Sequence, residues 1–301
     1  MNDVPSLPPL EVTAPVPEPR HALVLVSTPI GNLQDMSPRA AAALREADAV
    51  LCEDTRTSQT LLRAHGIRAE LYALHEHNEQ ARIPGLIAAM REGRSFALIS
   101  DAGTPLVSDP GYRLVRAAIE AGLSVSGIPG PNAALLALAL SGLPPHPFLF
   151  QGFLPPKQAG RRAALAKLRA AEAAGLRATL IFYEAPHRLA VCLADCAHVL
   201  GERPAAVCRE LTKRFEEVRR GGLQALAVHY EENLPRGEIT LVIGPAPDEI
   251  LEGEEFDQAL DAALRARMAT MSLKDAVAAV SLERRVPRRL VYARALALGG
   301  S

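Results

Sequence analysis

The sequence has no tryptophan, four cysteines and few aromatic side chains, and each shortage narrows the possible functions. With aromatic residues at only 4%, a platform that stacks several nucleic-acid bases is not expected. The cysteines, Cys52, Cys192, Cys196 and Cys208, lack the spacing of a disulfide scaffold or a zinc site, so we expect buried thiols. No apolar run is long enough to cross a membrane and the start does not resemble a signal peptide, so we expect a cytoplasmic protein.

Several common catalytic fingerprints are also missing. The sequence contains no Gly-x-Gly-x-x-Gly, no P-loop, no zinc-protease helix and no serine-nucleophile elbow. Glu53 and Asp54 stand where a dinucleotide-binding enzyme would hold ribose, but without the glycine fingerprint this is a weak signal. His75-Glu76-His77 is a weak metal signal, because alternating residues at a strand end rarely converge without partners. We expect no metal site.

Charge is balanced over the whole chain but uneven along it. Residues 21–150 carry ten basic and twelve acidic side chains, or −2, whereas residues 155–220 carry thirteen and seven, or +6. Residues 257–301 carry eight and four, or +4. This asymmetry indicates an anionic partner for the second half of the chain.

Alternating strand and helix patterns predict two α/β domains. The first has a parallel sheet with helices on both faces, and Ser37-Pro38 supplies the start of its first helix. The expected organisation is a disordered proline-rich leader, an N-terminal α/β domain, a C-terminal α/β domain and a helical tail, over residues 1–20, 21–143, 148–247 and 256–298. The tail resembles a helix-turn-helix, although a helical hairpin used only for dimer contacts explains the same pattern.

One turn-rich stretch, residues 100–111, stands out at the end of an apolar strand. It contains Ser-Asp twice, two glycines and two prolines. Stiff polar loops at the carboxyl ends of parallel strands are where open α/β sheets bind ligands. Asp54, Asp101 and Asp109 would repel a phosphate but suit a cationic ligand or ribose hydroxyls. A plain strand-to-helix connection with capping Asp and Ser is the alternative, and we expect residues 108–111 to cap the next helix and brace the loop.

Seven short motifs occur in a fixed order: Thr28-Pro29-Ile30-Gly31-Asn32-Leu33, Glu53-Asp54-Thr55-Arg56, Ser100-Asp101-Ala102-Gly103-Thr104-Pro105, Pro129-Gly130-Pro131-Asn132, Phe153-Leu154-Pro155-Pro156-Lys157, Tyr183-Glu184-Ala185-Pro186-His187-Arg188 and Arg209-Glu210-Leu211-Thr212-Lys213. The set closely resembles the ribosomal RNA small subunit methyltransferase I family of the tetrapyrrole methylase superfamily. Relatives that modify tetrapyrroles typically have a glycine-rich first loop and a Ser-Gly-Asp-Pro type of loop instead. The resemblance covers about residues 22–245, with a family-like helical tail.

The resemblance implies a class III methyltransferase with two α/β domains of the tetrapyrrole methylase type and a small C-terminal helical domain. It implies a homodimer that uses S-adenosyl-L-methionine to methylate the ribose 2′-hydroxyl of a decoding-centre cytidine in 16S rRNA. The residues that it implies for cofactor binding follow the strand ends of both domains: Thr28, Pro29, Ile30, Gly31, Asn32, Asp101, Ala102, Gly103, Thr104, Pro129, Gly130, Pro131, Asn132, Ala133, Phe182, Tyr183, Thr240 and Leu241.

Methyl transfer to a hydroxyl needs in-line alignment and a group that takes or polarises the proton. The candidate catalytic residues are Glu184, Glu210 and Lys213. Each has a plainer explanation: Glu184 could pair with Arg188 at a helix start, and Glu210 could form a surface pair with Arg209. Positioning alone could also suffice. The basic second domain predicts contacts with RNA phosphates, for which the candidates are Lys157, Arg161, Arg162, Arg188, Lys213 and Arg214.

Two other functions remain open at this point. One is a tetrapyrrole methyltransferase on the same fold, but a single anionic tetrapyrrole would account for fewer of the arginines that are spread over the second domain. A non-catalytic nucleic-acid-binding protein that uses the helix-turn-helix would leave the stiff loops of the first domain unexplained.

Overall fold

The computed structural model describes residues 20–247, 254–284, 286 and 288–299. The expected leader, apart from Arg20, lies outside the described residues. The chain divides into two units: the first runs up to Leu136 and includes Glu210–Glu216, and the second comprises Ala137–Arg209 and the chain from Glu217 onward. This division differs from the expected boundary near residue 143, and it assigns a short segment of the second half to the first unit. The expected domain bounds stay a prediction.

The first unit is built on a five-stranded sheet. Its strand order is β3-β2-β4-β1-β5, and every neighbouring pair is parallel, as the sequence predicts. The strands are β1 (Leu23–Val26), β2 (Ala49–Cys52), β3 (Leu71–Ala73), β4 (Phe96–Leu98) and β5 (Val125–Ile128). The connecting helices are η1 (Leu33–Asp35), α1 (Pro38–Glu46), α2 (Thr55–Ala64), α3 (Glu79–Arg91) and α4 (Tyr112–Glu120), and α5 (Ala133–Ser141) leads out of the unit.

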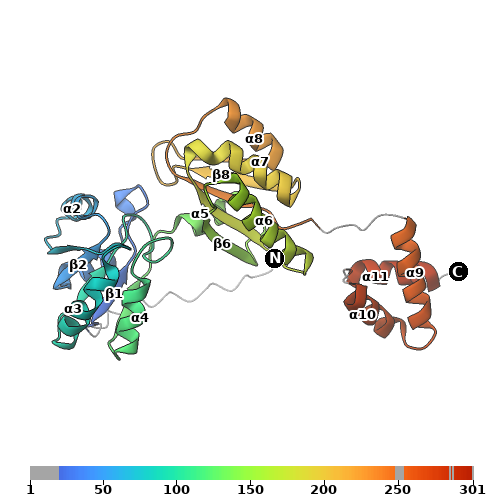
Figure 1. Ribbon diagram of the computed structural model, residues 1–301, viewed down its shortest axis with the longest axis horizontal. Coiled ribbons are helices and arrows are strands. Elements are labelled where there is room, and N and C mark those ends of the chain that lie inside the picture. The colour runs from blue at the N-terminus through green and yellow to red at the C-terminus, as the bar shows by residue number, and fades with distance from the viewer. Residues whose placement is uncertain (1–19, 248–253, 285, 287, 300–301) are drawn as a thin grey trace, which may run out of the picture. The chain divides into compact units, whose positions relative to one another are not determined.

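Successive side chains along the strands point to opposite faces of the sheet and pack into two cores, one on each face. Val26 and Val50 pack with Leu44 of α1 on one face, and Leu51 and Phe96 pack with helices α3 and α4 on the other. Helices therefore cover both faces, which confirms the predicted fold class for this half (Figure 1). The strands read as continuous apolar runs because both of their faces are buried.

The second unit has a mixed sheet with the order β6-β7-β10-β8-β9. Strands β6 and β7 are parallel and the remaining pairs are antiparallel. The strands are β6 (Phe148–Phe153), β7 (Thr179–Glu184), β8 (Pro204–Arg209), β9 (Glu217–Gly222) and β10 (Ile239–Ile243). The helices are α6 (Gln158–Ala173), η2 (Pro186–Arg188), α7 (Leu189–Leu200) and α8 (Leu223–Glu232).

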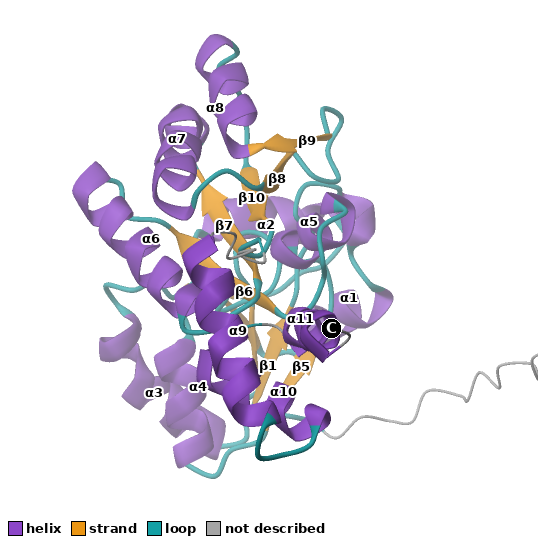
Figure 2. Ribbon diagram, turned by 90° about the vertical axis from the view of Figure 1, so that its right-hand side faces the viewer, coloured by secondary structure: helices purple, strands orange, loops and turns teal. Residues whose placement is uncertain are grey.

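Helices α6, α7 and α8 pack side by side on one face of this sheet, over a core that includes Leu165, Phe182 and Leu193 (Figure 2). All four cysteines of the chain are buried and reduced, as expected. Arg203 and Glu172 form a buried ion pair at 2.7 Å, which ties the end of α6 to the start of β8. Such a pair is held in place because separating it would leave a buried charge unpaired.

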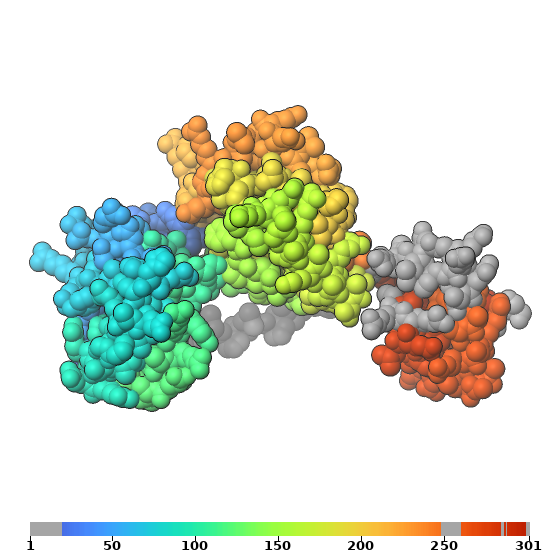
Figure 3. Space-filling view, in the orientation of Figure 1, coloured from blue at the N-terminus to red at the C-terminus, as the bar shows by residue number. Residues whose placement is uncertain are grey.

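Three helices form the tail: α9 (Glu254–Met268), α10 (Leu273–Arg284) and α11 (Arg288–Gly299). Leu264, Val280 and Val291, one from each helix, meet in an apolar core. Figure 3 shows the outer surface of the described part of this tail in orange and red. The amide of Asp275 donates to the Ser272 hydroxyl at 3.2 Å, so Ser272 caps α10. The expected helical tail is confirmed. Within the described ranges, no helix combines the length and apolar character that crossing a membrane requires.

Gly111 offers a sharp test of the packing in the first unit. Its φ is +117°, and a Cβ there would lie 2.6 Å from Cδ2 of Leu98 and 2.9 Å from Cδ2 of Leu106. We expect Gly111→Ala to lower the free energy of unfolding by about 3 kcal/mol, from backbone strain plus overpacking. Urea unfolding followed by circular dichroism measures this loss.

Gly93 is the matched control, because its φ is +94° but nothing lies within 4 Å of its Cβ position. Gly93→Ala should lower the free energy of unfolding only by the backbone strain of a positive φ, about 1 kcal/mol. Equal losses in the two variants would contradict the packing argument.

Candidate functional site

The loops that follow β1, β4 and β5 lie next to one another at the carboxyl edge of the first sheet. Strand β1 pairs with β4 on one side and with β5 on the other. Because all three strands are parallel, their carboxyl ends open onto the same edge. These loops contain the first-domain residues that the sequence predicts for cofactor binding.

A short bridge joins the first two loops. The amide of Thr28 donates to the Gly103 carbonyl at 2.9 Å, and the amide of Gly103 donates to the Thr28 carbonyl at 3.1 Å. Thr28 is fully buried, and its hydroxyl donates to the Ser100 carbonyl at 3.3 Å. The bridge fixes both loops against the end of the sheet.

The Thr104 hydroxyl attaches the third loop. It donates to the Pro131 carbonyl at 3.2 Å and accepts from Nδ2 of Asn132 at 3.3 Å. Gly130 also comes so close to Ser27 that a Cβ at residue 130 would lie 2.8 Å from the Ser27 Cβ. The structure thus brings together residues 28–32, 101–104 and 129–133, the three predicted loops of the first unit.

A segment from much later in the sequence completes this edge. Glu210–Glu216 belongs to the first unit, and the Asn32 amide donates to the Thr212 hydroxyl at 3.2 Å. The Lys213 side chain covers Gly31, where a Cβ would lie 2.8 Å from Cε of the lysine. Lys213, a predicted catalytic residue, therefore reaches a predicted cofactor loop. The sequence motif contains Thr212, but its bond to the first loop was not foreseen.

Lys213 and Glu210 form an ion pair at 2.8 Å, and both side chains are largely buried. Glu210 and Thr212 have φ values of +51° and +68°, which residues with a side chain rarely adopt. Strained backbone of this kind clusters at functional sites. The plain pairing of Glu210 with Arg209 is wrong, because Arg209 pairs with Glu217 at 3.0 Å.

Carboxylates collect beside the bridged loops. The Asp54 amide donates to Oδ1 of Asp101 at 3.3 Å, so the acidic side chains that follow β2 and β4 meet there. Partial burial raises the pKa of Asp101. The hydrogen bond from the Asp54 amide opposes this rise, and the charge of the Asp54 carboxylate adds to it. Burial and several carboxylates, Asp101 foremost, likewise raise the pKa of Glu53. The site is therefore short of positive charge and suits a cationic ligand.

Asp109 has the most perturbed carboxyl group of this edge. Burial raises its pKa to about 6, against the opposing effect of a hydrogen bond with the Ser100 hydroxyl, and the carboxylates of Glu53 and Asp101 add to the rise. The contact with Ser100 lies within the loop, which fits the expected bracing role of this residue.

Of residues 108–111, which we expect to cap the next helix, Gly111 takes the N-cap position of α4, but none of their side chains caps it. The amide of Leu114 donates instead to Oε1 of Glu79, a buried side chain of α3, at 3.0 Å. Since Glu79 satisfies this amide from the neighbouring helix, a local cap is not needed.

In the second unit, the predicted cofactor residues pair directly across β7 and β10. Phe182 lies opposite Leu241, and Tyr183 lies opposite Thr240. The side chains of Phe182 and Leu241 belong to the core beneath the helices, whereas Tyr183 is half-buried and contacts the ring of Phe150. Tyr183 and Thr240 are thus the pair on the opposite face of the sheet. Their role toward a cofactor stays a prediction.

Glu184 does not suit a catalytic role. Its side chain is 1% exposed, accepts from the Ala185 amide at 2.8 Å and pairs with Arg188 at 3.1 Å. A carboxylate held in this way braces the loop after β7. The plainer interpretation of the sequence, a pair at a helix start, is the one that the structure supports.

Two of the predicted RNA contacts are also engaged inside the fold. The Arg161 side chain is 4% exposed and pairs with the buried Asp195 at 2.6 Å. Arg188 donates to the Leu154 carbonyl at 2.8 Å in addition to its bond with Glu184. Arg161 is therefore too buried to meet an RNA phosphate, and the guanidinium of Arg188, whose side chain is 18% exposed, is already bonded to Glu184 and the Leu154 carbonyl.

The other basic candidates remain accessible to an anion. Lys157 and Arg214 are exposed, and Arg162 is 42% exposed although it shares Asp195 with Arg161. The guanidinium of Arg214 lies 5.5 Å from the centre of the Phe215 ring. Among the described residues, no three His, Cys, Asp or Glu side chains are grouped to hold a metal ion. The rings of His75 and His77 lie 6.0 Å apart, edge to face.

Comparisons with known proteins agree with this arrangement. Residues 22–227 match the model of the Tetrapyrrole (Corrin/Porphyrin) Methylases, and residues 254–299 match the RsmI C-terminal HTH domain. Three similar proteins carry the name Ribosomal RNA small subunit methyltransferase I. The Mesorhizobium japonicum protein is 54% identical over 79% of this chain and 80% of its own length. The Escherichia coli O157:H7 protein is 43% identical and the Halalkalibacterium halodurans protein 42% identical, each over 91% of this chain and 94% of its own length.

Solved structures show the same architecture. A uroporphyrin-III-C-methyltransferase from Thermus thermophilus matches 75% of this chain and 94% of its own, with 25% identity and a TM-score of 0.51. The methyltransferase CobJ matches 75% of this chain and 95% of its own, with 18% identity and a TM-score of 0.55. This second match shows a likeness of fold alone. The chain therefore belongs to the tetrapyrrole methylase family and, within it, to the ribosomal RNA small subunit methyltransferase I family.

Proposed function

We propose that the protein transfers a methyl group from S-adenosyl-L-methionine to the ribose 2′-hydroxyl of a decoding-centre cytidine in 16S rRNA. The observation that carries the proposal is the group of three bridged loops with Lys213 packed over Gly31. The names of the relatives, which refer to the RNA of the small ribosomal subunit, support the choice of substrate. We extend the proposal to a cytoplasmic homodimer on the resemblance to this family.

The loops of the first unit are tightly joined and lie beside carboxylates, which suits a sulfonium cofactor. Gly103 has a φ of +80° and its Cβ position lies 3.2 Å from Cγ2 of Ile30, so a side chain there would strain the backbone and crowd Ile30. The raised pKa values of Glu53, Asp101 and Asp109 mark a site where a positive charge would be stabilised. When bound, S-adenosyl-L-methionine supplies the methyl group as a positively charged sulfonium. The residues proposed to hold it are 28–32, 101–104 and 129–133.

Lys213 and Glu210 are the residues proposed to act on the ribose. The ammonium of Lys213 would orient the 2′-oxygen, and the Glu210 carboxylate, 2.8 Å from that ammonium, would take the hydroxyl proton. The Lys213 side chain lies over Gly31 of the loop that would hold the cofactor, so Lys213 and its partner Glu210 would align the oxygen with the methyl carbon. Glu184 is dropped from the catalytic set.

RNA phosphates would bind at the accessible cations. Lys157, Arg162 and Arg214 remain the proposed contacts, together with Lys213. Contacts of this type release counterions, so affinity should fall steeply as salt rises.

The substrate assignment is tested by incubating the protein with methyl-labelled S-adenosyl-L-methionine and small ribosomal subunits that lack the modification. We expect label on the 2′-oxygen of one cytidine in 16S rRNA, located by resistance of the adjacent bond to alkali. Label in a porphyrinoid, with none in 16S rRNA, would overturn the proposal in favour of tetrapyrrole methylation.

Lys213→Met and Glu210→Gln test the catalytic pair. Methionine keeps the apolar packing on Gly31, so we expect kcat to fall about 100- to 10,000-fold in either variant while the cofactor still binds. Single-turnover methylation of small subunits provides the rate. Glu184→Gln is the control: it should lower Tm but leave kcat within about three-fold in the folded fraction. A larger fall in kcat for Glu184→Gln than for Glu210→Gln would reverse the assignment.

The pH dependence of cofactor binding follows from Asp109. Because its pKa is raised to about 6, the carboxyl is ionised at pH 7.5 and mostly protonated at pH 5. A cationic ligand should therefore bind more weakly as pH falls through 6, as isothermal titration calorimetry with S-adenosyl-L-methionine would show. Asp109→Asn removes the charge at every pH, so its affinity should change less between pH 7.5 and 5. An unchanged pH dependence in this variant refutes the role of Asp109.

A further inference from the structure

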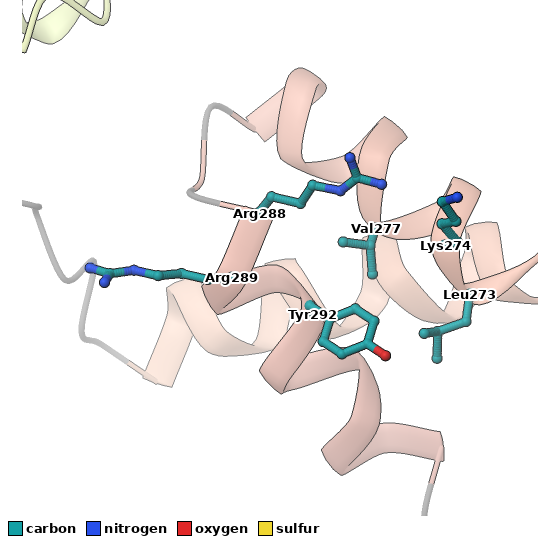
Figure 4. A pocket seen from close by; sticks show the side chains of 6 residues that line it. All are labelled: Leu273, Lys274, Val277, Arg288, Arg289 and Tyr292. Carbon is teal, nitrogen blue, oxygen red and sulfur yellow. The ribbon is translucent and has the colours of Figure 1, made fainter. Parts of the chain in front are cut away.

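The tail contains a groove that the proposed methyl transfer does not use. It lies between α10 and α11, has a volume of about 520 Å³ and is lined by Leu273, Lys274, Val277, Arg288, Arg289 and Tyr292 (Figure 4). This volume is within the range of about 300–1,000 Å³ that small-ligand pockets span. The groove is therefore large enough for one nucleotide.

The lining separates charge from apolar surface. Val277 is fully buried and forms the floor, with Leu273 beside it. Arg288 reaches from α11 toward α10, where Lys274 stands on the same side of Val277, and Arg289 points away from this group (Figure 4). The ring of Tyr292 projects toward Leu273 and is 46% exposed. Two cations thus stand at one end of the groove and an accessible aromatic ring at the other.

The charge of the tail favours an anionic occupant. Three acidic side chains of its described part bond elsewhere: Asp261 pairs with Arg294 at 2.6 Å, Glu283 pairs with Arg267 at 2.9 Å, and Asp275 accepts from the Ser272 hydroxyl at 2.6 Å. Lys274 and Arg288 are both exposed at the groove. A phosphate that binds there can form charge-assisted hydrogen bonds with both of these side chains.

We propose that this groove binds one unpaired nucleotide of single-stranded RNA, with its phosphate at Lys274 and Arg288 and its base against the ring of Tyr292. A base inside a duplex is already stacked, so only an unpaired base can lie on the tyrosine. One aromatic ring at one site differs from the multi-base platform that the low aromatic content argues against. The choice of RNA over DNA rests on the proposed function, whereas the groove chemistry stands without it.

The test measures binding of a fluorescent ten-nucleotide oligouridine to the full-length protein, without S-adenosyl-L-methionine. We expect Tyr292→Ala to weaken binding at least about five-fold and Tyr292→Phe to retain it, because phenylalanine keeps the stacking surface. Arg288→Ala should weaken binding and reduce the salt slope by about one unit. Arg265→Ala is the matched control, since Arg265 is exposed on α9 and does not line the groove.

Photocrosslinking locates the contact independently of the other basic surfaces. An oligomer of 4-thiouridine should crosslink to the peptide that contains Tyr292. The proposal is overturned if Arg265→Ala weakens binding as much as Arg288→Ala, if Tyr292→Ala has no effect, or if duplex RNA binds with the same dependence on Tyr292. Equal binding of oligothymidine would show a groove for either nucleic acid and overturn the choice of RNA. Because no methyl is transferred here, the result is separable from failure of the methylation assay.

Discussion

The bridge between Thr28 and Gly103 is the constraint on which the candidate site depends. Two backbone hydrogen bonds, at 2.9 and 3.1 Å, join the loops that follow neighbouring parallel strands. The third loop attaches through Thr104, and residue 103 has no Cβ to push the loops apart. Loops that are fixed before a ligand arrives lose less conformational entropy when it binds. The rigid edge of the first sheet is therefore suited to holding a cofactor in one orientation.

The carboxylates of the two units have different surroundings. In the second unit, Glu172, Glu184 and Asp195 are each matched by an arginine, and hydrogen bonds from Arg162 and Arg161 help hold the pKa of Asp195 below its usual value, against the opposing effect of burial. In the first unit, the pKa values of Asp101 and Asp109 are raised. A carboxylate matched by an arginine stabilises the fold, whereas carboxylates with raised pKa values in a group are typical of a site that receives charge from a ligand.

The fold could largely be predicted from the sequence because its signals are local. Apolar runs alternating with helical patterns predict the parallel sheet, and Ser37, whose hydroxyl accepts from the Ala40 amide at 3.0 Å, begins α1 as expected. The candidate cofactor loops of the first unit could be predicted for the same reason, since turn-rich motifs at parallel strand ends meet at one edge. The bridge itself could not be predicted from the sequence, because it joins two residues that are 75 positions apart.

Three of the missed features depend on partners distant in sequence. Arg161 looks like a phosphate contact until Asp195, 34 residues later, is found beside it. Glu79 caps a helix that begins 33 residues after it, where a local Ser-Asp pair offers a more obvious cap. Glu210 and Thr212 adopt left-handed backbone without being glycine, so nothing in the sequence indicates the turn that carries Lys213 to Gly31. Hydrogen–deuterium exchange with and without S-adenosyl-L-methionine tests the central claim most directly. The account predicts new protection in peptides that contain residues 27–32, 100–104 and 129–133, and binding of the cofactor without protection in these loops would contradict it.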